Sequence, residues 1–336
     1  MNAPARTPPG LVVREASASD NEGLIDLELQ CPIVMKGAEE TSDRSPDFFA
    51  CHRVQGIHRV VLAEIRRRPV GSMAGAIQSP VVRGRPRRLV YIQRGRIHPD
   101  YQRQGIAWKL ATDLFAWSQA YGAQGMYYLI APDNERSVAF GGRAGRKWPM
   151  HVRLLGFDVS GAGGSQARRI DDDQLVAVVE LVNRTHAGED FFEPLTTDSL
   201  AERLSRDGQY RIGNLLGVVD GEQLVAVAGL WDKGAFAEHI RIDRVTGLES
   251  RSRSALVVDW GWAPGYESSF AGLLCSLAHE AGMLGRSTLT ICEPAPGMVP
   301  DPGLGRHETN LSLYTPTIEP PDASAIKGLF PDLLTL

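Results

Sequence analysis

The sequence predicts an α/β (α+β) protein built from two related domains. Apolar residues follow a period of two in some segments and a helical period in others, so strands and helices are mixed along the chain. The length of 336 residues suits two domains of ordinary size. The order strand, proline, helix, glycine, strand at residues 89–130 recurs at residues 256–292, which indicates a duplicated domain.

In the first half, capping residues and prolines mark the ends of helices, and apolar alternation marks strands. In order, we expect a strand at residues 11–14, a helix capped by Ser19-Asp20-Asn21 and ended by Cys31-Pro32, a helix at 43–51, strands at 60–65, 70–77 and 89–97, a helix from Gly105, a strand at 126–130 and a helix at 134–143. The helix from Gly105 has the clearest pattern, because apolar residues at 106, 110, 114, 117 and 121 place one apolar stripe along it. Gly122 then suits the end of this helix.

A glycine-rich segment at residues 161–168 reads as a flexible linker. It divides the chain into a loose tail at 1–10, a first domain at 11–160 and a second domain at 169–336. In the second domain we expect strands at 217–219, 224–231, 256–262 and 288–292, with a helix whose apolar stripe runs from Phe270 to Leu284.

Composition limits where the protein works. An apolar content of 43% supports buried cores, but no apolar run is long enough to cross a membrane, and the first ten residues do not resemble a secretory signal. The four cysteines are scattered, which favours free thiols in a reducing cytoplasm over disulfides or a metal site. We therefore expect a cytoplasmic protein with no membrane segment and no metal.

Charge is distributed unevenly. Residues 1–160 contain 22 Lys and Arg against 15 Asp and Glu, whereas the remainder contains 14 against 25. The basic run from Arg83 to Arg88 has no interleaved aromatic residues, which argues against nucleic acid and leaves either a solvated hairpin tip or a phosphate site. The acidic second half favours a cationic acceptor through long-range attraction, and we expect it to form part of the roof over the site.

The segment Gln102-Arg103-Gln104-Gly105-Ile106-Ala107 lies between a predicted strand and a predicted helix. A glycine allows close approach of the backbone, and the free N–H groups at a helix start point at an anion. The segment therefore predicts a cradle for a pyrophosphate. The corresponding segment of the second half, Gly265 to Phe270, lacks this spacing and contains Glu267, so we expect that half to bind no cofactor.

The motif from Ile97 to Ala107, with the helix and strand that follow it and Asn134-Glu135-Arg136-Ser137, resembles the GNAT superfamily, the GCN5-related N-acetyltransferases. The resemblance covers most of residues 11–158, and the second half resembles a degenerate copy, as in tandem-GNAT acyltransferases. It implies that each domain is a mixed, mostly antiparallel sheet with splayed central strands and flanking helices. It also implies acetyl-CoA or another acyl-CoA as co-substrate, with the pantetheine arm between strands 89–97 and 126–130.

The resemblance assigns cofactor contacts by position. The backbone of Ile97 would bond to the pantetheine amides, Asn134 would meet the pantetheine arm, and Phe140 would line its thiol end. The pyrophosphate would be held by the N–H groups of Gln102, Arg103, Gln104, Gly105, Ile106 and Ala107.

Two catalytic positions depart from the family pattern. Gly141 stands where many members carry a tyrosine that acts as general acid, so Ser137, Tyr127, Tyr128, a water or a group from the second domain would have to replace it. The missing side chain would also leave space near the thiol for a larger acyl group. Tyr91 stands where some members place a glutamate base, and a phenol with a reference pKa of ~10 is a poor base at neutral pH.

Other candidate groups surround the expected acceptor region. His98 and Glu64 are further candidates for the base. Asp43, with Glu39 and Glu40, lies in the loop region where the family binds the acceptor, and Cys31 faces the same region, either as a packing residue or as a nucleophile.

The resemblance implies an acyl-CoA-dependent N-acyltransferase, most simply one that transfers an acetyl group to a primary amine of a small molecule or peptide by direct attack in a ternary complex. Two alternatives stay open. One is a non-catalytic acyl-CoA sensor, consistent with the missing acid and base. The other is an enzyme with a longer or carrier-bound acyl donor, in which the basic segment from Arg83 to Arg96 would dock an acidic carrier protein.

Overall fold

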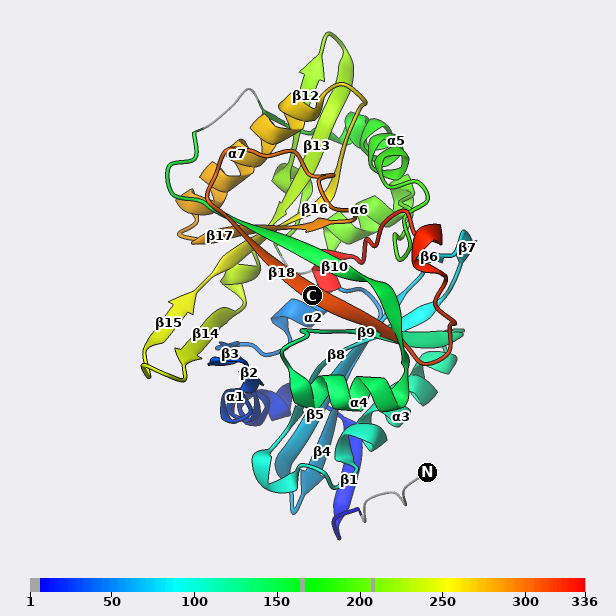
Figure 1. Cartoon of the computed structure of the whole chain (residues 1–336), viewed down its shortest axis with the longest axis vertical. Coiled ribbons are helices and arrows are strands. Elements are labelled where there is room, and N and C mark those ends of the chain that lie inside the picture. Colours follow the sequence, from blue (N-terminus) through cyan, green and yellow to red (C-terminus); the bar gives the residue numbers. More distant parts are fainter. Residues whose placement is uncertain (1–6, 164–166, 207–208, 336) are drawn as a thin grey trace.

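The computed structural model describes residues 7–163, 167–206 and 209–335, and a twelve-stranded sheet runs along the long axis of the molecule (Figure 1). The strand order is β1-β4-β5-β8-β9-β18-β10-β17-β16-β13-β12-β11. The first half of the chain forms the end with β1, and the second half forms the end with β12. The mixed sheet with flanking helices confirms the predicted fold class. Residues 1–6 of the predicted tail and 164–166 of the predicted linker lie outside the described residues.

The first half contains ten strands and four α-helices among the described residues. The strands are β1 (Leu11–Glu15), β2 (Ile33–Met35), β3 (Ala38–Asp43), β4 (His58–Ile65), β5 (Arg68–Gln78), β6 (Val81–Val82), β7 (Arg85–Pro86), β8 (Leu89–Ile97), β9 (Gly125–Ile130) and β10 (Arg146–Asp158). The helices are α1 (Asn21–Gln30), α2 (Ala50–Arg53), α3 (Ile106–Gln119) and α4 (Glu135–Ala144).

The second half repeats much of this order. Its strands are β11 (Arg168–Arg169), β12 (Leu215–Asp220), β13 (Gln223–Trp231), β14 (Glu238–Asp243), β15 (Glu249–Ser252), β16 (Ser254–Trp262), β17 (Thr288–Glu293) and β18 (Arg306–Thr315). Its α-helices are α5 (Leu175–Thr185), α6 (Thr197–Ser205) and α7 (Glu267–Met283). Among the described residues, no helix combines the length and the apolar character that a membrane span requires.

Strands β8 and β9 separate partway along their length. They pair in parallel only from Leu89 opposite Gly125 to Tyr91 opposite Tyr127. On its other edge, β9 pairs with β18 from Tyr128 to Ile130. The predicted splay of the two strands is therefore present, and it opens toward the carboxyl ends of both strands.

The two halves exchange strands. Strand β18, from the second half, lies between β9 and β10, while β10, from the first half, pairs with both β18 and β17. The proposed ranges 11–160 and 169–336 therefore describe the order of the chain, whereas each half of the sheet is completed by a strand from the other.

Hairpins also cross between the halves. Strand β14 pairs with β3 over six residues, and with β15 and β2 they form a separate four-stranded sheet. In the opposite direction, Val81 of β6 bonds to Phe191 and Phe192 through backbone groups. Each half thus has its loop after the first helix held by a hairpin of the other half.

Helices α1 and α3 cover opposite faces of the first half. On β4, Val61 packs in the cluster that holds α3, and the neighbouring Leu62 packs in the cluster that holds α1, as strand alternation requires. The predicted stripe of α3 is confirmed for Ile106, Leu110 and Leu114, which are buried. The residue at 121 is exposed because the helix ends at Gln119, after which Gly122 takes a left-handed φ of 75°.

The helix expected at residues 43–51 is wrong. Residues 38–43 form β3, and only Ala50–Arg53 are α-helical. The segment 38–43 is polar and lacks the apolar alternation of a strand, and it is extended because β14 pairs with it. A partner about 200 residues away in the chain is not visible in local sequence.

Candidate active site

A cleft of about 800 Å³ opens where β8 and β9 separate. Its walls come from residues 31–34, from Gly95, Arg96 and Ile97 of β8, and from parts of residues 101–108 and 134–143. All of these residues belong to the first half, so the described second half supports the site from behind, through β14 on β3, rather than lining it.

A β-bulge shapes the strand that lines this cleft. Ser72 of β5 pairs with Arg96, but Ala74 pairs with Gln93, so Arg94 and Gly95 together lie opposite a single residue. Arg94 takes a φ of 53°, which is uncommon for a residue with a side chain. A bulge leaves its extra residue outside the ladder of hydrogen bonds. The bulge therefore brings the backbone of Gly95 to the wall of the cleft.

The predicted pyrophosphate cradle lies at the mouth of the cleft. Helix α3 begins at Ile106, after Arg103 with a φ of 60° and Gly105 with a φ of 76°. The first four N–H groups of a helix have no partner within it and carry the positive end of its dipole. Five of the six predicted cradle residues line the cleft, namely Gln102, Arg103, Gly105, Ile106 and Ala107. Gln104 does not line it, and its side chain donates to the carbonyl of Asp100 at 3.0 Å.

The other predicted donor contacts also lie at this cleft. Ile97 lines it, although its carbonyl oxygen also accepts a bond from the Gln102 amide at 3.3 Å. Asn134 lines it and caps α4 by accepting the Ser137 N–H at 3.1 Å. Phe140 lines it and packs edge-on against Trp108, near the start of α3, with ring centroids 6.5 Å apart.

The expected space at Gly141 is absent. A Cβ atom built on Gly141 would lie 2.7 Å from Ile130 Cδ1 and 3.3 Å from the ring of Tyr128. This glycine therefore packs against β9 and opens no room for a larger acyl group. Tyr127 and Tyr128 do not replace the missing acid at the cleft, because their hydroxyls donate to Gln78 and to the Gly141 carbonyl; Ser137 does line it.

None of the three candidate bases, Tyr91, Glu64 and His98, lines the cleft, and Nδ1 of His98 accepts the N–H of Asp100 at 3.3 Å. Tyr91 is buried against Tyr127, with ring centroids 4.9 Å apart, and burial raises its pKa well above the usual value. It closes the point at which β8 and β9 part. Glu64 lies on β4 and accepts a bond from Arg14 at 2.9 Å. The geometry therefore supports none of these residues as the base.

The acceptor candidates differ in position. Cys31 lines the cleft, but burial raises its pKa to about 11, so the thiol is protonated at neutral pH and unsuited to act as a nucleophile. Asp43 is the last residue of β3, where it faces Glu238 in the β3–β14 ladder, away from the cleft walls. Its Oδ1 accepts the N–H of Ser45 at 2.8 Å, which lowers its pKa.

The sequence did not single out the charged groups beside the reaction end of the cleft. Arg96 lies on the face of β8 opposite Ile97, and its Nη2 is 3.1 Å from Oε1 of Glu28 on α1. Glu28 Oε2 in turn lies 3.2 Å from Nε of Arg44. The one available signal was a glutamate at a buried position of an amphipathic helix, which requires a partner.

The second half has the same strand geometry, but described side chains fill the place that corresponds to the cleft. Strand β16 has a bulge at the corresponding place, with Asp259 at a φ of 47°. The next residue, Trp260, corresponds to Gly95 and is fully buried against Phe330 at 5.3 Å and His186 at 4.3 Å between ring centroids. Aromatic rings therefore fill the space that is open in the first half.

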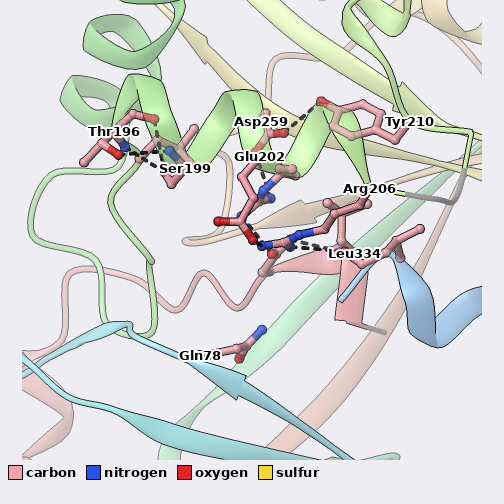
Figure 2. A network of polar contacts seen from close by, with 12 residues as sticks. Gln78, Thr196, Ser199, Glu202, Arg206, Tyr210, Asp259 and Leu334 are labelled. Atoms are coloured by element: carbon pink, nitrogen blue, oxygen red, sulfur yellow. Dashed lines mark hydrogen bonds and ion pairs between the residues drawn. The ribbon is translucent and has the colours of Figure 1, made fainter. Parts of the chain in front are cut away.

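Asp259 belongs to a structural network. Figure 2 shows it and Tyr210 pointing toward each other, with the Tyr210 hydroxyl donating to Asp259 at 2.8 Å. Arg203 joins Asp259 at 2.9 Å to Asp332, in the last part of the chain, at 3.1 Å. These contacts hold the carboxyl-terminal segment in the second half.

Comparisons with known proteins agree with the motif. Residues 22–145 match the acetyltransferase (GNAT) family. No curated protein sequence matches the chain. The chain is similar to Saccharomyces cerevisiae N-myristoyltransferase with bound myristoyl-CoA, with a TM-score of 0.64 at 9% identity over 94% of this chain and 84% of that one.

Two further solved structures are similar. One is a GCN5-related N-acetyltransferase from Sphaerobacter thermophilus, with a TM-score of 0.60 at 12% identity over 96% of this chain and all of that one. The other is a glucosamine N-acetyltransferase region of a fungal multi-domain GH3 β-N-acetylglucosaminidase, with a TM-score of 0.62 at 12% identity over 91% of this chain and 38% of that one. At these identities the likeness concerns the fold. With the family match, the cradle motif and the splayed strands all in its first half, residues 22–145 form a domain of the acetyltransferase (GNAT) family.

Proposed function

We propose that the protein is an acyl-CoA-dependent N-acyltransferase that transfers an acyl group, most simply acetyl, to a primary amine. The observation that carries this proposal is the cleft between β8 and β9, with the free end of α3 at its mouth. The pantetheine arm would add to the open edge of β8 beyond Tyr91, and the pyrophosphate would meet the N–H groups that start α3.

The chemistry relies on position and on the bulge. The amine nitrogen attacks the thioester carbonyl, the oxygen becomes negative, and the C–S bond breaks to release the thiolate of CoA. The bulge N–H beside Gly95 would stabilise the oxyanion, and alignment of the two substrates supplies much of the rate. Water that reaches the open cleft accepts the proton of the amine, because neither Tyr91 nor Glu64 lies there.

A carrier-bound donor fits the structure less well. The basic hairpin of β6 and β7 lies beside Leu89, at the closed end of the β8–β9 pair. Ile97, at the open end, is eight residues farther along β8, or about 26 Å at ~3.3 Å per residue. A carrier docked on that hairpin would have to deliver its acyl group to the far end of the strand.

The test is to replace Gly105 with valine. At a φ of 76°, a β-branched residue distorts the cradle, and we expect the stabilisation by acetyl-CoA to be lost. Gly265→Val is the matched control, because Gly265 also has a positive φ of 87° before a helix but lies outside the cleft. Thermal unfolding with CoA, acetyl-CoA and longer acyl-CoAs measures the effect.

Release of CoA thiol with a panel of amines then separates an enzyme from a sensor. Turnover with at least one amine is expected. Donor binding without turnover would favour the sensor, and unchanged donor binding in Gly105→Val would refute the assigned cradle.

A further inference from the structure

An ion-pair chain lies behind the reaction end of the cleft. Arg96 lies on the cleft wall, Glu28 lies behind it, and Arg44 lies behind Glu28. Their side chains are 12%, 2% and 1% exposed, so the chain is almost fully withdrawn from water. The charges along it alternate as positive, negative and positive.

The ion-pair chain of Arg96, Glu28 and Arg44 carries a net positive charge. Burial alone would raise the pKa of Glu28, but Arg44 and Arg96 outweigh it and hold the pKa below its usual value. The carboxylate is therefore ionised and balances one of two guanidiniums, which stay protonated in proteins. Burying an unbalanced charge is costly unless a partner of opposite sign is supplied.

The hydrogen-bond donors of the two arginines are also in surplus. Within the described part of the protein, Nη1 and Nη2 of Arg44 and Nε of Arg96 are buried and have no hydrogen-bond partner. A guanidinium presents five donors in a planar fork that matches a carboxylate. Arg96 is the member that reaches the cleft; its Nη2 donates to Glu28 and its Nη1 to the backbone carbonyl of Gly95 at 3.3 Å, which leaves the second hydrogen of Nη1 for a further anion.

On the side of the sheet where Arg96 lies, the wall of the cleft has no other charged residue among those described, whereas Arg103, Glu135, Arg136 and Arg143 line its other parts. On the same side of the sheet the wall consists of Cys31, Pro32, Ile33 and Val34, and the Cys31 thiol is protonated. The pyrophosphate cradle lies toward α3, on the other face of β8, so Arg96 is not placed to serve it. A substrate group at this wall meets one cation and several apolar surfaces.

Building on the proposed acyl transfer, we propose that Arg96 binds a carboxylate carried by one of the two substrates, next to an apolar portion that packs on Ile33 and Val34. The carboxylate belongs either to a dicarboxylic acyl group on CoA or to an amino-acid-like acceptor. Both sources present a carboxylate to the guanidinium of Arg96. In both cases its negative charge would continue the alternation of charge along Arg44, Glu28 and Arg96.

Paired ligands that differ in one carboxylate test this proposal. Succinyl-CoA and butyryl-CoA test the acyl source. N-acetyl-leucine and N-isopentylacetamide test the acceptor source, and as product analogues they need no turnover. We expect at least tenfold tighter binding, by calorimetry, of the carboxylate-bearing member of one pair.

Variants assign the effect to Arg96. Arg96→Met should remove the preference, whereas Arg96→Lys should keep part of it through charge alone. Arg103→Met, on the cradle side, should weaken both CoA esters by the same factor. Equal binding within both pairs, or a preference that persists in Arg96→Met, would overturn the proposal. If neither CoA ester binds, the acyl transfer proposal fails while the amide pair still decides whether Arg96 selects a carboxylate.

Discussion

Strands β8 and β16 occupy equivalent places in the two halves and differ at one critical residue. Both have a bulge at a residue with positive φ, Arg94 in one and Asp259 in the other. After the bulge, β8 has Gly95 on the wall of an open cleft, whereas β16 has Trp260 in a packed aromatic cluster. The comparison teaches that the same bulged strand can border an open cleft in one half and a packed aromatic cluster in the other.

The next residue along each strand, Arg96 in β8 and Gly261 in β16, shows the same contrast. Arg96 reaches Glu28 across a gap to α1. Its counterpart Gly261 has no room for a side chain, because a Cβ atom there would lie 2.6 Å from Thr185 Oγ1 and 3.0 Å from the Leu181 carbonyl oxygen on α5. The second half has thus replaced a charged gap with direct helix–strand packing.

The largest expected effect comes from removing an aromatic ring from the packed cluster in the second half. Trp260→Ala removes a fully buried ring from the contacts with Phe330 and His186, and we expect a loss of about 3–5 kcal/mol in the free energy of unfolding. Urea unfolding measures this. A loss below ~1 kcal/mol would mean that the aromatic cluster is not the core of the second half.

The second largest effect should come from placing a large side chain in the open cleft of the first half. Gly95→Trp copies Trp260 into the first half, and we expect binding of acetyl-CoA to weaken about a hundredfold, or ~2.7 kcal/mol, because the indole occupies the end of the cleft. Gly95→Ala is the control, since its Cβ would lie 3.2 Å from the movable Met73 Cε. Equal affinity in wild type and Gly95→Trp would show that the acyl end binds elsewhere.

The smallest effect concerns acid stability. His52 is buried, and its Nε2 has no hydrogen-bond partner among the described residues; burial lowers its pKa to about 3, helped by Arg44 and His58 and opposed by Gln55 and Glu28. Between pH 6.5 and 3 the unfolded state binds the extra proton, so this histidine makes stability fall as pH falls, by about 1.4 kcal/mol per unit. His52→Gln should remove this term from the difference in stability between pH 7 and pH 5.5, measured by urea unfolding. Parallel pH dependence of the two proteins would contradict the assignment.

Local sequence predicted the elements that depend on local pattern. Strand β8 and the first turns of α3 follow from apolar spacing and the glycine motif, and both confirm the prediction. Strand β3 was expected as a loop, followed by a helix from Asp43, because its partner β14 is remote in sequence. The exchange of β10 and β18 was not predicted for the same reason, because each of these strands pairs with strands of the other half that are remote in sequence.

The donor side of the site could be predicted better than the acceptor side. The cradle is a contiguous motif, so its residues carry their own signal. Arg96, Glu28 and Arg44 come from β8, α1 and the loop after β3, and only the packed fold brings them together. Tyr91 looked suitable by position, but its ring faces Tyr127 and its hydroxyl has no place at the cleft.

The exchanged strand has a consequence for biosynthesis. Strand β9 pairs with β8 at the closed end of the opening, and its other neighbour, β18, begins at Arg306, more than 170 residues later in translation. While the chain is still on the ribosome, the edge of β9 therefore waits without its neighbour until nearly the whole protein has emerged. Completion of the sheet in the half that holds the cleft is thereby tied to synthesis of the other half, and a chain that ends before Arg306 lacks the strand that pairs with β9.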